Sequence, residues 1–272
     1  MNVLYFELAM TAYLIAAVLF LVYLPGSGRR ETLLAAALGG TLAGFVFHTA
    51  ALTVRWRELG GFPVTTAYEA ASFFSWTLIL VFLLFDFRLR IHVLGAFAVP
   101  LAFLSVFAAA LLRTSAAPLD PRLQGLGLTL HTSLMVLGAV AFCISFLAGI
   151  MYVIQMRLLK SKHFGNLYAQ LPPLEVCDAM IARGVLGGFP LTTLGLLSGA
   201  IGARYVWGHY WEWTPKETVS LLVWGFYLLM LLGRYWLGMR AQRGAYLAIA
   251  GFLAVMLSFM GIDVVLGEHR HF

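Results

Sequence analysis

Eight long runs of mostly apolar residues, separated by shorter polar connections, dominate this sequence. A helix needs roughly 20 predominantly apolar residues to cross the hydrocarbon core of a bilayer, and the runs approach or exceed that length. The pattern therefore predicts an all-α polytopic membrane protein with about eight transmembrane helices. The runs are Ala9–Leu24, Leu33–Val54, Ala70–Phe85, Ile91–Leu112, Leu126–Ile154, Val185–Ile201, Val219–Leu237 and Ala245–Leu266.

The composition also indicates a membrane protein. Of the 272 residues, 61% are hydrophobic and 11% are charged, whereas roughly 25% are charged in an ordinary soluble domain. We treat residues 1–272 as a single integral membrane domain embedded in the lipid bilayer. The formal net charge of +6 does not indicate nucleic-acid binding. The basic residues form short clusters between apolar runs, as topology determinants do, so no nucleic-acid partner is expected.

The distribution of the basic residues predicts the orientation of the chain. If the N-terminus is external, the inner connections hold more of the 18 Lys and Arg residues than the outer ones, as the positive-inside rule requires. This predicts a multi-pass protein of the cell inner (plasma) membrane, with both termini and the connection around Trp207 outside. The loop Arg55–Tyr68 is expected on the same external face. The polar loop Gln155–Arg183 is expected inside, as a cytoplasmic contact surface.

A short aromatic stretch, Tyr205–Glu217, reads YVWGHYWEWTPKE and contains three of the seven tryptophans in the chain. Dense aromatic rings can anchor helices at a membrane–water boundary, and they can also form a flat apolar platform for a planar ligand. Both interpretations are open at this point. The rings concerned are those of Trp207, Tyr210, Trp211 and Trp213.

The end of the aromatic stretch carries a helix-start signal. Thr214 is a good N-cap, Pro215 suits the first helical position, and Glu217 stands three residues after the cap, which is the pattern of a capping box. We therefore predict that a helix begins at Thr214. Its unpaired N–H groups, together with Lys216, would favour an anion.

His131 is the most informative of the seven histidines. It lies in LTLHTSL, near the external start of a predicted helix, where an unpaired imidazole is costly. A helix N-terminus disfavours imidazolium, so the ring should be neutral and able to coordinate a metal. His269 and His271 lie beyond the last apolar run, on the same predicted face.

Two neutral histidines that face each other across an aromatic floor would form a bis-imidazole haem site. Lys216, Arg204 or the helix start at Thr214 would be available for the propionates. Under the alternative interpretation, the tryptophans anchor helices and the histidines form hydrogen bonds with loop carbonyls. The residues alone do not decide between the two.

Other polar residues have less specific interpretations. His48 is predicted to lie within a transmembrane helix, where it would bind a second haem position or form a hydrogen bond to another helix. His209 is a loop hydrogen-bonding residue or a ligand, and His163 is expected to be solvated. Glu69 and Asp263 lie near external helix ends and are expected to reach toward water.

The segment WGHYWEWTPKE followed by TVSLLVWGFY resembles the WWD signature of haem-handling cytochrome c biogenesis proteins, and it defines a WWD-like segment at residues 205–224. The resemblance to the CcsA/ResC branch of system II covers nearly the whole chain. Further matching stretches are FPVTTAYEAASFFSW, HTSLMVLGAVAF, LPPLEVCDAMIARGVLGGFPLTTLGLLSGA and the tail GEHRHF. The Trp-rich motif is highly specific for this family.

The resemblance implies that haem b is held non-covalently at the external face by the aromatic segment. His131 and His269 match the family's external histidine pair, so they would be the axial ligands of the haem iron. Haem would be presented to the CxxCH motif of apocytochrome c for thioether attachment, with a CcsB/ResB-type membrane subunit completing the cytochrome c synthase (haem lyase).

Two positions depart from the family pattern. Thr214 stands where the motif usually has aspartate, and Leu232 stands where many synthase members carry a histidine within the membrane. The second departure raises the alternative of a HemX-like haem-binding accessory or regulatory protein without synthase activity. An aromatic-belted transporter or structural subunit without haem is a third hypothesis.

Overall fold

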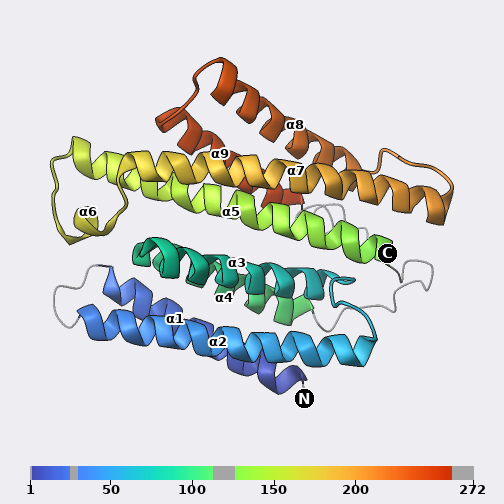
Figure 1. The fold of residues 1–272 in the computed structure, drawn as a ribbon, viewed down its shortest axis with the longest axis horizontal. Helices are drawn as coiled ribbons and strands as arrows, with labels where there is room; N and C mark the ends of the chain where they lie inside the picture. Colours follow the sequence, from blue (N-terminus) through green and yellow to red (C-terminus); the bar gives the residue numbers. More distant parts are fainter. Residues whose placement is uncertain (1, 25–29, 113–125, 259–272) are drawn as a thin grey trace. The chain divides into compact units, whose positions relative to one another are not determined.

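The computed structural model describes residues 2–24, 30–112 and 126–258. Seven helices in these ranges are long and apolar enough to cross a membrane, and a shorter apolar helix follows them (Figure 1). The expectation of an all-α polytopic membrane protein with about eight helices is confirmed. The helices are α1 (Asn2–Tyr23), α2 (Arg30–Leu59), α3 (Ala67–Leu89), the 3-10 turn η1 (His92–Leu94), α4 (Gly95–Leu112), α5 (Leu126–Lys160), α6 (Asn166–Gln170), α7 (Leu174–Trp207), α8 (Pro215–Trp236) and α9 (Gln242–Met256).

Several helices extend well beyond the apolar runs that predict them. Helix α7 has 34 residues, which at 1.5 Å per residue is about 50 Å, longer than the roughly 30 Å hydrocarbon core. The prediction that Gln155–Arg183 forms a polar loop is wrong, because most of these residues are helical. Helix α5 continues to Lys160 and α7 begins at Leu174, with the single turn of α6 between them. Hydropathy marks the apolar part of a helix, whereas the hydrogen-bonded helix continues into polar sequence.

The chain divides into two compact units, which we describe separately. Unit 1 comprises residues 1–116 and 158–171, and unit 2 comprises residues 117–157 and 172–272. The expectation of a single integral domain stays a prediction.

Unit 1 is a bundle of α1 to α4. Fully buried aromatic and aliphatic side chains fill its interior, including Phe6, Phe20, Leu78, Phe82 and Leu94. Hydroxyl groups connect α3 to α4, because Ser75 donates to the carbonyl of Ala102 and Ser105 donates to that of Ala71. Small residues allow close approach of α2 to α1, since Gly44 lies directly against the buried ring of Tyr13.

Unit 2 is built on a close antiparallel contact between α5 and α7, which we call the α5–α7 seam. Contact residues recur along each helix at intervals of three and four residues, the spacing of one helix face. Most of them on α7 are glycines, which allow the two backbones to approach closely. The seam pairs Ser145 with Gly184, Phe142 with Gly188, Gly138 with Thr192, Met135 with Gly195, and His131 with Gly199.

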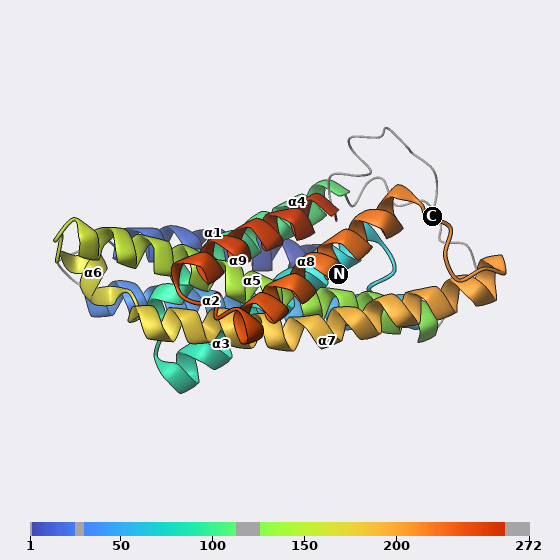
Figure 2. The same cartoon turned by 90° about the horizontal axis from the view of Figure 1, so that it is seen from above.

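Helices α8 and α9 complete unit 2 as a hairpin (Figures 1 and 2). An ion pair fixes the base of this hairpin, because Arg234 of α8 lies 2.7 Å from a carboxylate oxygen of Asp178 of α7. The other oxygen of Asp178 accepts a hydrogen bond from the backbone N–H of Ala241, just before α9. One carboxylate therefore connects three helices.

We predict that Gly44→Ala destabilises unit 1. A Cβ atom at this position would lie 2.6 Å from the ring of Tyr13, which is fully buried, and overpacking of this kind costs typically about 1–3 kcal/mol. Thermal unfolding in detergent measures the effect. Gly39→Ala is the matched control in the same helix, because a Cβ there meets no atom within 4 Å. Equal melting temperatures for the two variants would contradict the packing argument.

Candidate functional site

The aromatic stretch forms the turn between α7 and α8. Helix α7 ends at Trp207, where Gly208 adopts a positive φ of 87° that suits glycine. Most rings of the turn are largely uncovered: the exposed fraction is 56% for Trp207, 59% for Tyr210 and 69% for Trp213. Trp211 is more buried and meets Trp213 edge to face. This arrangement leaves an apolar aromatic surface accessible to a ligand or to lipid.

The predicted capping box at the start of α8 is confirmed. The hydroxyl of Thr214 accepts from the backbone N–H of Glu217, and the Glu217 carboxylate accepts from the backbone N–H of Thr214. The same carboxylate oxygen also accepts from the N–H of Glu212, at 3.0 Å. Trp213 lies between these two donors with φ of +59°, a conformation that costs energy for a non-glycine residue. Glu217 therefore holds the turn on both sides of Trp213.

Arg204, which the sequence offers as a partner for a haem propionate, already has contacts within the turn. It donates to the carbonyl of Gly208 and stacks over the ring of Tyr210.

Two buried nitrogens of the turn lack a partner. Nδ1 of His209 and the indole nitrogen of Trp211 have no hydrogen-bond partner within the described ranges. Unpaired buried polar atoms are uncommon, and both of these nitrogens belong to the aromatic turn.

The helix start also offers less to an anion than the sequence predicts. The carboxylate of Glu217 already lies at this end of α8, and the backbone N–H of Glu217 is bonded to Thr214. In the first turn of α8, the side chain of Lys216 carries a positive charge that would favour an anion.

His131 lies in α5 on the α5–α7 seam and is partly buried. Its Nδ1 is 2.7 Å from the carbonyl oxygen of Gly195. A carbonyl only accepts hydrogen bonds, so Nδ1 carries a proton, and in the neutral ring that the sequence predicts Nε2 carries the lone pair. Nε2 has no hydrogen-bond partner among the residues that the structure describes. This is the tautomer that suits a metal ligand whose second nitrogen is held by a carbonyl.

Lys216, in the first turn of α8, belongs to the same unit as His131 and contributes to the electrostatic field at the imidazole. His269 and His271 lie outside the described residues.

His48 lies within α2, as predicted, and is fully buried in unit 1. Its Nε2 is 2.9 Å from the hydroxyl of Ser72 in α3, and its Nδ1 is 3.4 Å from the hydroxyl of Tyr13 in α1. Both ring nitrogens therefore have partners on neighbouring helices. Of the two interpretations of His48, these contacts favour hydrogen bonding between helices.

The expectation that Glu69 reaches toward water is wrong. Its side chain is 2% exposed and forms an ion pair of 2.9 Å with Arg55. It also completes a capping box with Thr66 at the start of α3. The pattern Thr66-x-x-Glu69 is a sequence signal for this cap that hydropathy alone passes over, while the ion-pair partner is visible only in the fold.

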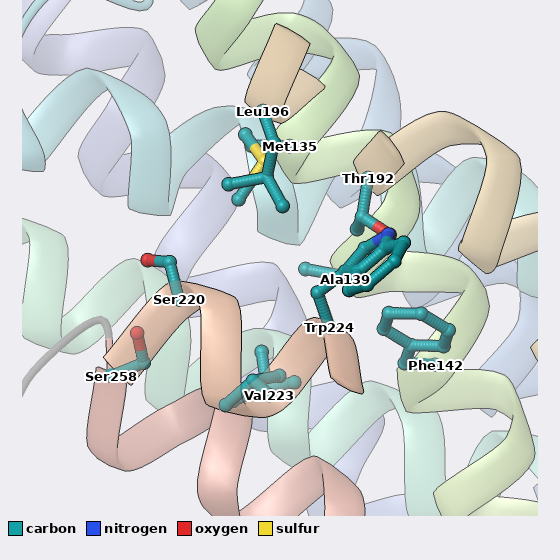
Figure 3. Close-up of a pocket in the computed structure, with 10 residues that line it drawn as sticks. Met135, Ala139, Phe142, Thr192, Leu196, Ser220, Val223, Trp224 and Ser258 are labelled. Carbon is teal, nitrogen blue, oxygen red and sulfur yellow. The ribbon is translucent and has the colours of Figure 1, made fainter. Parts of the chain in front are cut away.

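A small cavity in unit 2 adjoins the WWD-like segment (Figure 3). Its volume is about 30 Å³, room for one or two water molecules but not for a porphyrin. Trp224, the last residue of the segment, lines it and donates to the hydroxyl of Thr193 at 2.9 Å. The other lining residues are Met135, Ala139, Phe142, Thr192, Leu196, Ser220, Val223, Val255 and Ser258.

Comparison with known proteins gives a consistent result. The family described as "Cytochrome C assembly protein" matches residues 64–269. A protein named cytochrome c biogenesis protein CcsA from Guillardia theta is 32% identical, with 86% of this chain and 83% of the relative covered. Proteins of the same name from Chlamydomonas reinhardtii and Microcystis aeruginosa are 33% and 28% identical. The match to the Chlamydomonas protein covers 81% of this chain and 63% of the relative. The match to the Microcystis protein covers 96% of this chain and 94% of the relative. Because the family match spans most of the sequence, the chain belongs to the cytochrome c assembly protein family and is of the CcsA type.

Proposed function

We propose that this chain is the haem-handling subunit of a system II cytochrome c synthase, which holds haem at the external membrane face for attachment to apocytochrome c. Its family membership supports a role in cytochrome c biogenesis, which involves haem. The observation that carries the proposal of a haem site is the tautomer of His131. Its Nδ1 donates a hydrogen bond to the carbonyl of Gly195, while Nε2 keeps its lone pair.

The residues of the turn fit a porphyrin in their chemistry. A porphyrin is large, flat and apolar on both faces, and the largely exposed rings of Trp207 and Trp213 offer apolar aromatic surface of the same kind. Lys216, in the first turn of α8, supplies a positive charge for a propionate. We assign His131 and His269 as the axial ligands, with Trp207, Tyr210, Trp211 and Trp213 as the platform.

Bound haem supplies two vinyl groups as the acceptors for cysteine thiols. In each addition, the thiol S–H adds across a vinyl C=C bond, so that sulfur bonds to one carbon and hydrogen to the other, without a leaving group. The contribution of this chain is to position the substrate and to keep its faces covered. A CcsB/ResB-type membrane subunit is the proposed partner, and the aromatic turn and both termini are proposed to lie outside the plasma membrane.

A HemX-like accessory role is the second candidate, and two observations favour it. Leu232, a residue without ligand atoms, lies within α8 at the position where many synthase members have a histidine. His48, which is buried in unit 1, has partners on both ring nitrogens. An accessory protein that binds haem only at an external site would need no iron ligand at residue 232 or at His48.

We predict that the purified protein binds haem with a low-spin bis-histidine spectrum, and that His131→Ala loses most of the low-spin signal because one axial ligand is gone. Absorption spectra of the oxidised and reduced protein measure this. His163→Ala is the control, since His163 is exposed and its Nδ1 lies 3.2 Å from the carbonyl oxygen of Ser161. Unchanged spectra in both His131→Ala and His269→Ala would remove the ligand assignment.

Covalent attachment separates the two candidate functions. We predict that co-expression with a CcsB/ResB-type subunit and a CxxCH-containing apocytochrome c gives haem that stays on the cytochrome after denaturation. Haem staining of denaturing gels measures the product. A competent partner that yields no attached haem with this chain would instead support the accessory role.

We predict that Glu217→Ala loosens the aromatic turn without removing an axial ligand. Loss of a capping residue costs about 0.5–2 kcal/mol, and this change also releases the N–H of Glu212. We expect weaker haem binding with an unchanged low-spin spectrum, measured by haem titration. Glu212→Ala is the control, because it keeps that backbone N–H. A spectrum lost as fully as in His131→Ala would show that our division of roles is wrong.

A further inference from the structure

The place of His131 depends on a glycine of the neighbouring helix. His131 occupies the last described contact of the α5–α7 seam, where it lies against Gly199. A Cβ atom at residue 199 would lie 2.7 Å from Nδ1 and 2.8 Å from Cε1 of the imidazole. Non-bonded atoms do not approach so closely, so the ring lies against α7 only because residue 199 has no side chain.

The same contact determines the tautomer. With the ring against the backbone of α7, Nδ1 reaches the carbonyl oxygen of Gly195 one turn earlier. The hydroxyl of Ser198 donates to this oxygen as well, at 2.8 Å. A ring displaced from α7 would lose its hydrogen bond, and its proton would then be free to occupy either nitrogen.

We infer that Gly199 is a positioning residue for the His131 ligand. Its missing side chain lets the imidazole reach Gly195, which places the proton on Nδ1 and directs the Nε2 lone pair away from that carbonyl. This inference rests on the proposed function, in which Nε2 binds the haem iron. Gly199 contacts the ligand and not the haem, so it acts through His131.

The neighbouring glycines provide the comparison. A Cβ at Gly202, one turn further along α7, would meet no atom within 4 Å. A Cβ at Gly195 would meet Met135, a flexible side chain that borders the 30 Å³ cavity and has room to move. Among these three positions, an added methyl group is expected to displace the imidazole only at residue 199.

The first experiment uses haem-free protein labelled with ¹⁵N-histidine, and the His131 signals are identified by their absence in His131→Gln. Nuclear magnetic resonance should show a proton on Nδ1 of His131 in the wild type and in Gly202→Ala. In Gly199→Ala the signals should move toward a mixture of tautomers. A wild-type ring with its proton on Nε2 would overturn the inference without the need for any variant.

The second experiment measures haem affinity and spin state. Loss of a group that orients a metal-bound histidine typically lowers metal affinity about 10- to 100-fold, and we expect a decrease in that range for Gly199→Ala with Gly202→Ala unchanged. In the His131→Gln background, Gly199→Ala should add no further loss, because the two residues act as one unit.

The outcomes separate this inference from the proposed function. If the wild type binds haem and Gly199→Ala matches it in tautomer and affinity, the inference is overturned while the proposed function stands. If the wild type binds no haem, the proposed function and the positioning role of Gly199 both fail, even where the tautomer shifts as expected. An additive loss in the double variant would also overturn the inference, because Gly199 would then act independently of His131.

Discussion

Lipid offers no hydrogen-bond partners, and this constraint shapes the whole structure. Backbone groups in the apolar spans must be satisfied within helices, and polar side chains in the spans must find partners on neighbouring helices. Several polar side chains of the described spans follow the second rule. His48 contacts Ser72 and Tyr13, Ser75 donates to a carbonyl of α4, and Trp224 donates to Thr193.

The candidate haem site follows from the same constraint. A neutral imidazole within a helix bundle needs a partner for its N–H group, and the carbonyl of Gly195 is the acceptor that the α5–α7 seam brings within reach. The partner occupies Nδ1 and leaves Nε2 for other chemistry. A contact that stabilises the bundle therefore also prepares a nitrogen ligand. The aromatic turn follows α7 directly, so the helix that orients His131 also carries Trp207, the first residue of the proposed platform.

Local features of the site were predictable from sequence, whereas features that need two helices were not. The capping box of Thr214 and Glu217 was predicted correctly, because its hydrogen bonds join residues three apart. The interpretation of Glu69 failed, because its ion-pair partner Arg55 is 14 residues away on another helix. The partner of His131 is 64 residues away, and its position depends on how α5 and α7 align along the entire seam.

The sequence by itself determined the membrane class, the helical fold, the start of α8 and the dense aromatic segment, because hydropathy, caps and composition act over a few neighbouring residues. Tertiary structure alone decided that His48 is a link between helices, that Glu69 is buried and paired, and that His131 carries its proton on Nδ1. Each of these depends on which faces of two helices meet, which is a property of complementary packing over many residues. Gly199 illustrates the difference, since its role lies in the side chain that it lacks and becomes visible only beside the ring of His131.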